Sequence, residues 1–276
     1  RDRKMTPQAR ENMIRKHGLH LPLVKQYALY MERLILHGDF AESSHYENVS
    51  VNTIIAEHAP YSFLLGGLAL LVSLVLAIPL GIAAAEHEGG LLDRAARAGA
   101  LFFVSIPGIV LAPVAILFFS FGLGLFPAGL WEGAASLVLP VLTLALPFAA
   151  RLLLLVREKA AAAFHSEYVR AARARGISSS RLRYTHILKN SLIPVTAYLA
   201  PGTAALLPGS IVVESIYVLP GLGKYFVQSA FNRDYFLMGG VMILYFGMLV
   251  ILNMLADIAV QFLDPRTRGT GTGGNR

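Results

Sequence analysis

The sequence predicts an all-α protein that crosses a membrane several times. Of the 276 residues, 55% are hydrophobic and only 15% are charged, whereas about a quarter of the residues of a typical soluble domain are charged. The charges are also segregated, because long runs carry none. About 20 apolar residues in a helix cross a hydrocarbon core of ~30 Å. The chain has no cysteine, which excludes a disulfide scaffold, a zinc–thiolate site and an iron–sulfur cluster.

The charge-free runs predict five membrane-spanning helices, at 61–85, 99–121, 135–156, 190–213 and 235–256. The second run, 98–131, is too long for one span and ends in glycines and a proline, so we expect a turn after 121. The third span continues past a single arginine, Arg151, into four leucines.

Lysine and arginine counts in the loops predict the orientation of the chain. The loop 86–98 has two, the segment 157–191 has eight and the tail 264–276 has three. The loops on the other side, 122–134 and 215–235, have none and two. By the positive-inside rule, the first three segments and the C-terminus are cytoplasmic.

This orientation divides the chain into three parts. Residues 1–60 form an extracytoplasmic segment, 61–268 form the membrane domain and 269–276 form a flexible tail. Five spans place the two ends on opposite sides, so the outer segment needs something to export it. We therefore expect a sixth helix, first in order, upstream of Arg1.

The cytoplasmic segment 157–191 carries the most informative pattern. Residues 159–175 are rich in helix formers, Gly176 suits the left-handed position after a helix, and serines at 178–180 suit the start of a second helix at about 180–190. The basic residues are compatible with contact to anionic lipid. The small residues Ala171 and Ala172 favour close approach of another protein surface.

The residues EYVRAARARG at 167–176, followed by HILKNSLIPV, resemble the coupling loop of ABC-importer permeases. Ala171, Ala172 and Gly176 match the general pattern, and Arg170 stands where it has glutamate. This departure is typical of the dipeptide, oligopeptide and nickel branch. The segments 18–43, 214–238 and 263–268 resemble the same branch, and 125–146 resembles its oligopeptide members.

The resemblance implies a type I importer permease fold and a set of partners. Such a permease pairs with a sister permease to form a heterodimer, binds two cytoplasmic ATPases that hold ATP and Mg²⁺, and receives peptide from an extracytoplasmic binding protein. It lies in a bacterial inner membrane, contacts lipid and binds no nucleic acid. The chain has no GxxxxGK[ST] phosphate loop, so it is expected to hold no cofactor and to be no enzyme itself.

The motif assigns the ATPase-docking surface to ten residues of the loop: Tyr168, Val169, Arg170, Ala171, Ala172, Arg173, Arg175, Gly176, Ile177 and Arg181. Glu214 and Asp257 lie at the edges of spans, where an acid is a functional candidate. Asn253 lies one turn before Asp257 on the same face of the helix. Glu214, Asp257 and Asn253 are therefore the candidates for the gate or the pathway. The outer loop adds candidates that could face the binding protein: Pro220, Gly221, Gly223, Arg233 and Asp234.

Other classes remain as alternatives. A nickel or other small-solute permease belongs to the same family, although no metal site is predicted in this chain. A self-contained secondary transporter would need inverted repeats or several intramembrane charges. An intramembrane protease would need HExxH, GxSxG or paired aspartates at membrane depth, and the sequence has none of these, since no second aspartate in a span could pair with Asp257.

Overall fold

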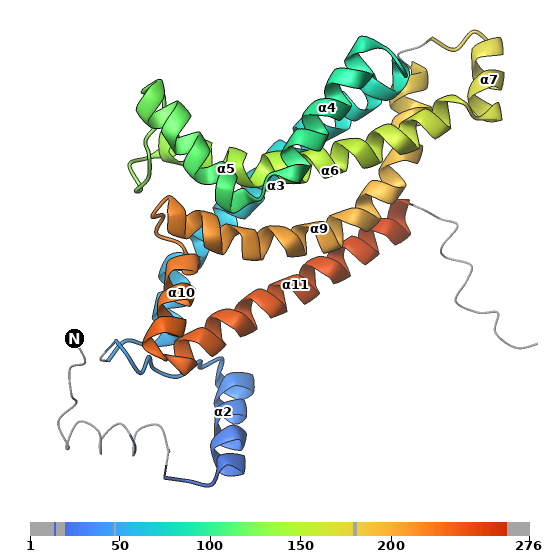
Figure 1. The fold of residues 1–276 in the computed structure, drawn as a ribbon. Coiled ribbons are helices and arrows are strands. Elements are labelled where there is room, and N and C mark those ends of the chain that lie inside the picture. The colour runs from blue at the N-terminus through green and yellow to red at the C-terminus, as the bar shows by residue number, and fades with distance from the viewer. Residues whose placement is uncertain (1–13, 15–19, 47, 179–180, 264–276) are drawn as a thin grey trace, which may run out of the picture.

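The structure is a computed structural model that describes residues 14, 20–46, 48–178 and 181–263. The predicted flexible tail 269–276 lies outside the described residues. Apart from one isolated bridge between Glu42 and Ser50, the regular structure of the described residues is helical (Figure 1). The α-helices are α2 (Leu23–His37), α3 (Val51–Glu86), α4 (Leu91–Ser105), α5 (Gly108–Ala115), α6 (Val138–Phe164), α7 (Glu167–Ala174), α9 (Leu188–Ile216), α10 (Leu222–Asn232) and α11 (Tyr235–Leu263). Shorter helical segments are Ile116–Gly122, Ala134–Leu137 and Leu182–Ile187.

Three helices in the described part are long and apolar enough to cross a membrane. They are α3, the segment Ala134–Phe164 that contains α6, and Tyr235–Leu255 of α11. A bent pair, α4 with Gly108–Gly122, counts as a fourth if it forms one span. Helix α9 coincides with the span predicted at 190–213, but several of its side chains lie outside the described part. A fifth span therefore stays a prediction.

The second predicted span is not the single helix expected at 99–121. Helix α4 ends at Ser105, and the helical segments on either side of the break meet at 103°. Ile106 is extended (φ −95°, ψ 118°), because the ring of Pro107 disfavours a helical conformation in the residue before it. Pro107 then opens α5. The apolar run is continuous in sequence, so hydropathy alone concealed the bend.

Two other boundaries differ from the expectation. Helix α3 begins at Val51 rather than at 61, because the Ser50 hydroxyl caps it by accepting a hydrogen bond from Asn52 N (3.2 Å). The helix predicted at 159–175 is interrupted. α6 runs on to Phe164, and the extended Ser166 (φ −72°, ψ 152°) precedes a separate α7.

The core lies between α3 and α6, which form the most extensive helix pair. One buried cluster surrounds Leu152 and Val156, and a second surrounds Leu65 and Tyr217. Gly81 lets the two helices approach, since a Cβ atom there would lie 2.8 Å from Val156 Cγ1. Figure 1 shows α7 and α10 at opposite ends of α9, so the molecule has an α7 end and an α10 end.

Candidate functional site

Helix α7 has one buried face and one exposed, basic face. Val169 (0% exposed) and Ala172 (2%) belong to the core cluster around Leu152 and Val156. The exposed face carries most of the predicted docking residues, namely Tyr168, Arg170, Ala171, Arg173 and Arg175. Gly176 and Arg181 are also exposed, while Ile177 is half-buried against the same cluster. Val169 and Ala172 therefore hold the helix in place and are not available to a docked partner.

Gly176 ends α7 with the geometry that the sequence predicts. Its φ of +74° is left-handed, a conformation that glycine adopts without strain. Gly176 N donates to Arg173 O (2.9 Å) and Ile177 N donates to Ala172 O (3.2 Å). This pair of bonds is a Schellman motif, which satisfies the last carbonyl groups of the helix. The chain turns sharply there towards the helical segment Leu182–Ile187, which continues into α9.

An ion-pair cluster joins the loops at the α7 end. Its six members come from segments far apart in sequence: Glu86, Glu88, Asp93, Arg157, His165 and Arg183. At its centre, Arg157 donates from Nε and Nη2 to the two carboxylate oxygens of Asp93 (2.9 and 2.8 Å). Asp93 is almost fully buried, and it also accepts a hydrogen bond from Gly89 N (3.0 Å). Two parallel bonds of this kind fix orientation as well as distance.

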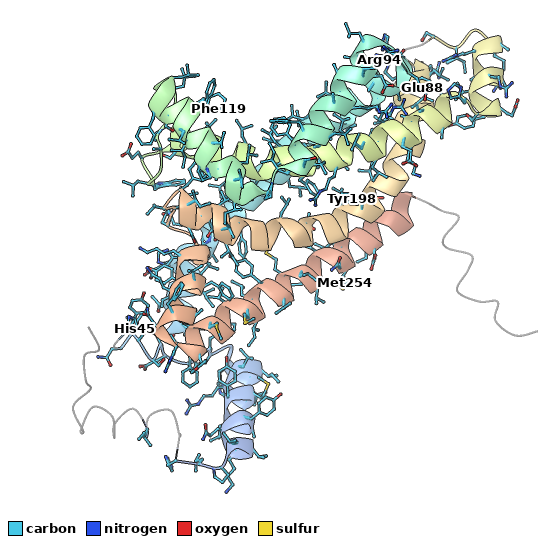
Figure 2. All side chains as sticks on the ribbon, viewed as in Figure 1. His45, Glu88, Arg94, Phe119, Tyr198 and Met254 are labelled. Atoms are coloured by element: carbon cyan, nitrogen blue, oxygen red, sulfur yellow. The ribbon has the colours of Figure 1, made fainter. Side chains whose placement is uncertain are left out.

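The periphery of the cluster reaches α3 and α7. Glu88 lies 3.1 Å from Arg157 Nη2 and 2.8 Å from His165 Nε2, next to the start of α7. The hydrogen bond from His165, with the charge of Arg157, lowers the pKa of the Glu88 carboxyl. Arg183 pairs with Glu86 at the end of α3 (2.7 Å). Figure 2 shows Glu88 and Arg94 at this end of the molecule.

The ion-pair cluster is a feature that sequence reasoning missed. The charges were visible in the loops, and they served to predict orientation and docking. Nothing in their spacing pairs Glu88 with Arg157 or Glu86 with Arg183, because each pair is separated by a spanning helix or more. The one available signal was the presence of three acids, at 86, 88 and 93, in a loop otherwise expected to be basic.

Glu214, at the opposite end of α9, holds the start of α10. Its carboxylate accepts hydrogen bonds from Gly223 N (2.7 Å) and from Ser210 Oγ (3.0 Å), and it is 1% exposed. Leu222 N donates to Ser62 Oγ on α3 (2.9 Å). Two oxygens thus satisfy the first free N–H groups of α10, where a negative charge also meets the positive end of the helix dipole.

Two predicted glycines make this contact possible. A Cβ atom on Gly221 would lie 2.3 Å from Glu214 Oε2, and one on Gly223 would lie 2.7 Å from Ile211 Cα and O. A side chain on Gly223 would push α10 away from α9, and one on Gly221 would displace the carboxylate of Glu214. The structure therefore brings Glu214, Gly221 and Gly223 together, as an anchor for α10.

Asp234 ties the N-terminal segment to the start of α11. Its carboxylate accepts hydrogen bonds from Ser43 Oγ, from Ser44 N and Oγ (3.2 and 3.1 Å), and from Leu237 N (3.2 Å). Tyr46 OH donates to Gln228 Oε1 on α10 (3.0 Å). Residues 43–46, α10 and the start of α11 are thus connected at the α10 end, where Figure 2 labels His45.

The remaining candidates do not belong to the Glu214 anchor of α10. The Pro220 carbonyl oxygen lies 2.7 Å from His58 Nδ1, and Arg233 is exposed at the end of α10. On α11, Asp257 is exposed and Asn253 is half-buried. In the part of the chain that the structure describes, no hydrogen bond links these two side chains to Glu214.

A cavity of about 300 Å³ lies where α5, α6 and α9 meet. Its wall includes Pro107 and Gly108 at the bend, Thr143 and Arg151 on α6, and Val213 on α9. Thr143 Oγ1 lies 2.9 Å from Tyr217 OH, which in turn donates to Ala112 O (3.3 Å). Tyr217, directly after α9, thus contacts α5 and α6, and Thr143 belongs to the cavity wall.

The comparisons with known proteins agree with the resemblance found in the coupling loop. A family model for the binding-protein-dependent transport system inner membrane component matches residues 77–269. The oligopeptide transport system permease protein OppB of Haemophilus influenzae is 36% identical over 269 residues, which cover 97% of this chain and 88% of the relative. The dipeptide transport system permease protein DppB of Bacillus subtilis is 36% identical over 258 residues, covering 94% and 83%.

The fold also matches solved structures. An inward-facing chain of the MetNI methionine ABC transporter superposes with a TM-score of 0.65 at 20% identity, covering 77% of this chain and 97% of that one. At that identity the match shows the fold alone. The relatives establish the rest. The chain belongs to the family of inner membrane components of binding-protein-dependent transport systems, and it is a permease subunit of an ABC importer.

Proposed function

We propose that this chain forms, with a sister permease, the membrane pathway of an importer for dipeptides or oligopeptides, and that α7 docks on a partner ATPase. The relatives carry oligopeptide and dipeptide transport in their names. The observation that carries the coupling role is the geometry of α7. One face is locked into the membrane domain, and the other presents Tyr168, Arg170, Arg173 and Arg175.

The arrangement suits the transmission of force from outside the chain. A helix that docks on a moving partner must be rigidly connected to the spans it moves. α7 follows α6 after two residues, and the segment that follows Gly176 leads into α9. The Arg157–Asp93 pair then connects the end of α6 to α4. ATP and Mg²⁺ belong on the ATPase partners in this proposal, and the exposed arginines of α7 would face acidic groups there.

The proposed orientation places the α7 end and the C-terminus in the cytoplasm, and the α10 end outside. The orientation can be tested by labelling single introduced cysteines, because the 276 residues contain no cysteine that would react as well. We expect Arg94→Cys on α4, exposed at the α7 end and outside the proposed docking surface, to react with a membrane-impermeant maleimide only after cells are opened. The matched variant Lys224→Cys, exposed on α10, should react in spheroplasts that are intact. The reverse pattern would overturn the orientation.

The function itself is tested on the full-length protein purified from its own membranes. Mass spectrometry should identify a second permease, chains with phosphate loops and a binding protein. The complex in proteoliposomes should accumulate a labelled peptide only with ATP and the binding protein present. Recovery of this chain alone, in detergent that preserves a known importer, would refute the partnership. Uptake of nickel without uptake of any peptide would refute the substrate class.

A further inference from the structure

Arg151 is a charged residue within an otherwise apolar span, in the part of the span nearer to α7. It lies on α6, and no other charge occurs between 133 and 156. An ionised side chain at this depth is unfavourable unless it meets water, a counter-charge or a ligand, so such a residue is a functional candidate by default. Arg157, two turns further along the same helix, shows the structural solution, because it pairs with Asp93.

Among the described residues, Arg151 has no such partner. In the part of the chain that the structure describes, it forms no ion pair and no hydrogen bond, and its side chain is exposed. Arg151 instead lines the cavity between α5, α6 and α9. A span that keeps an unpaired cation beside a cavity of about 300 Å³ has room there for part of a ligand.

The other polar groups of the cavity wall favour an anion. Helix α5 begins after Pro107, so the N–H groups of Gly108 and Ile109 open the helix without an intrahelical acceptor. Gly108 and Ile109 line the same cavity as Arg151, whose guanidinium group presents five donors in a planar fork. No carboxylate lines this cavity among the described residues. A planar anion with two oxygens matches the guanidinium fork in geometry and in charge.

From these observations we infer that Arg151 binds the C-terminal carboxylate of the peptide as it passes through the membrane. The inference rests on the proposed function and names a site within it. Side chains differ from one peptide to another, but each unmodified peptide has one terminal carboxylate. A pathway that must accept many sequences can therefore recognise that group, and the arginine offsets the loss of hydration that the carboxylate meets between apolar helices.

The test compares a peptide with its carboxamide in the complete importer in proteoliposomes. A panel of alanine-rich peptides of two to five residues first identifies one that the wild-type complex imports. Uptake of this peptide and of its C-terminal amide is then measured for the wild type, Arg151→Met and Arg151→Lys. The ratio of acid to amide uptake is compared between variants, so any preference of the binding protein cancels. Arg94→Met, an exposed arginine of α4 outside the cavity, is the matched control.

We expect Arg151→Met to lower uptake of the free acid about 10- to 100-fold, the range for loss of a hydrogen bond to a charged group. Uptake of the amide should change less than about threefold. Arg151→Lys should restore part of the acid preference, because it keeps the charge without the fork. Arg94→Met should leave the ratio unchanged.

Three results would count against the inference. An equal fall for acid and amide would show that Arg151 holds the complex together, for instance by pairing with an acid of the sister permease. Unchanged uptake of both would show that the residue faces lipid or water. If the wild-type complex imports no peptide of the panel, the proposed function is refuted, and this inference with it.

Discussion

Substitution of Gly223 by alanine tests whether Glu214 and its neighbours anchor α10. The added Cβ atom would lie 2.7 Å from both the Cα and the carbonyl oxygen of Ile211. These are backbone atoms of α9, so no side chain can rotate to relieve the contact. Helix α10 must move outward instead, and the hydrogen bond from Gly223 N to Glu214 (2.7 Å) lengthens or breaks.

The expected loss of stability follows from these two effects. Overpacking of a well-packed site costs about 1–3 kcal/mol, and a hydrogen bond to a charged group contributes about 1.5–3 kcal/mol. We therefore expect a loss of about 3 kcal/mol or more. For a domain of this size, about 1 kcal/mol corresponds to roughly 2–4 °C, so the melting temperature of the detergent-solubilised complex should fall by about 6–12 °C.

The matched control is Gly66→Ala, one turn after Ser62 on α3. A Cβ atom there meets nothing within 4 Å, and alanine is the better helix former by up to about 1 kcal/mol. This variant should melt at or slightly above the wild-type temperature. Equal melting temperatures for the Gly223 and Gly66 variants would show that α10 is not held against α9, and the interpretation of Glu214 as an anchor would fail.

Three further predictions concern other parts of the chain. Gly81→Ala places a Cβ atom 2.8 Å from an α6 side chain, so a loss of about 1–3 kcal/mol is expected in thermal melts. Gly176→Ala strains the end of α7 by about 1–2 kcal/mol, so the ratio of peptide imported to ATP hydrolysed should fall. The control is Gly38→Ala, because Gly38 is also left-handed (φ +60°) and has free space around it. This control should leave the ratio unchanged. The hydrogen bond from His165 is the main cause of the lowered pKa of Glu88, so ionised Glu88 stabilises the fold at pH values above its ordinary pKa of 4.5. This stabilisation is lost as the pH falls through the lowered pKa. The difference in melting temperature between wild type and Glu88→Gln should therefore vanish in acid, and a difference that persists there would contradict the pairing.

The fold was predictable because hydrophobic length is a local property. The charge-free runs located α3, α6 and α11 directly. Pro107 permits a kink, but the sharp break there was not predicted, because the apolar run continues on both sides of the proline. The start of α3 at Val51 was missed for the opposite reason, since the polar residues Asn52, Glu57 and His58 interrupt the apolar pattern in the first turns of that helix.

The functional site was predictable only where its residues lie close together in one segment of the sequence. Gly176 and the exposed face of α7 lie within ten residues of one another, so their spacing revealed the helix and its end. Glu214 was recognisable as an acid at the edge of a span, but its partners Ser62 and Gly223 come from α3 and α10. The ion-pair cluster was hidden altogether, because Glu88 and its partner Arg157 meet only after α6 has folded back along α3.

These contacts suggest which parts of the chain move together. Bidentate pairing with a buried Asp93 makes the end of α6 and the start of α4 one body, since breaking such a pair costs about 3–5 kcal/mol. Close packing of Gly81 against Val156 and the Leu153 carbonyl oxygen likewise holds α3 against α6. At the α10 end, Glu214 fastens α10 to α9. A force applied at α7 is thus carried by firmly connected helices from one end of the chain to the other. Opening of the pathway is then expected mainly between this chain and the sister permease proposed above, which is the arrangement in which alternating access by rigid-body rocking operates.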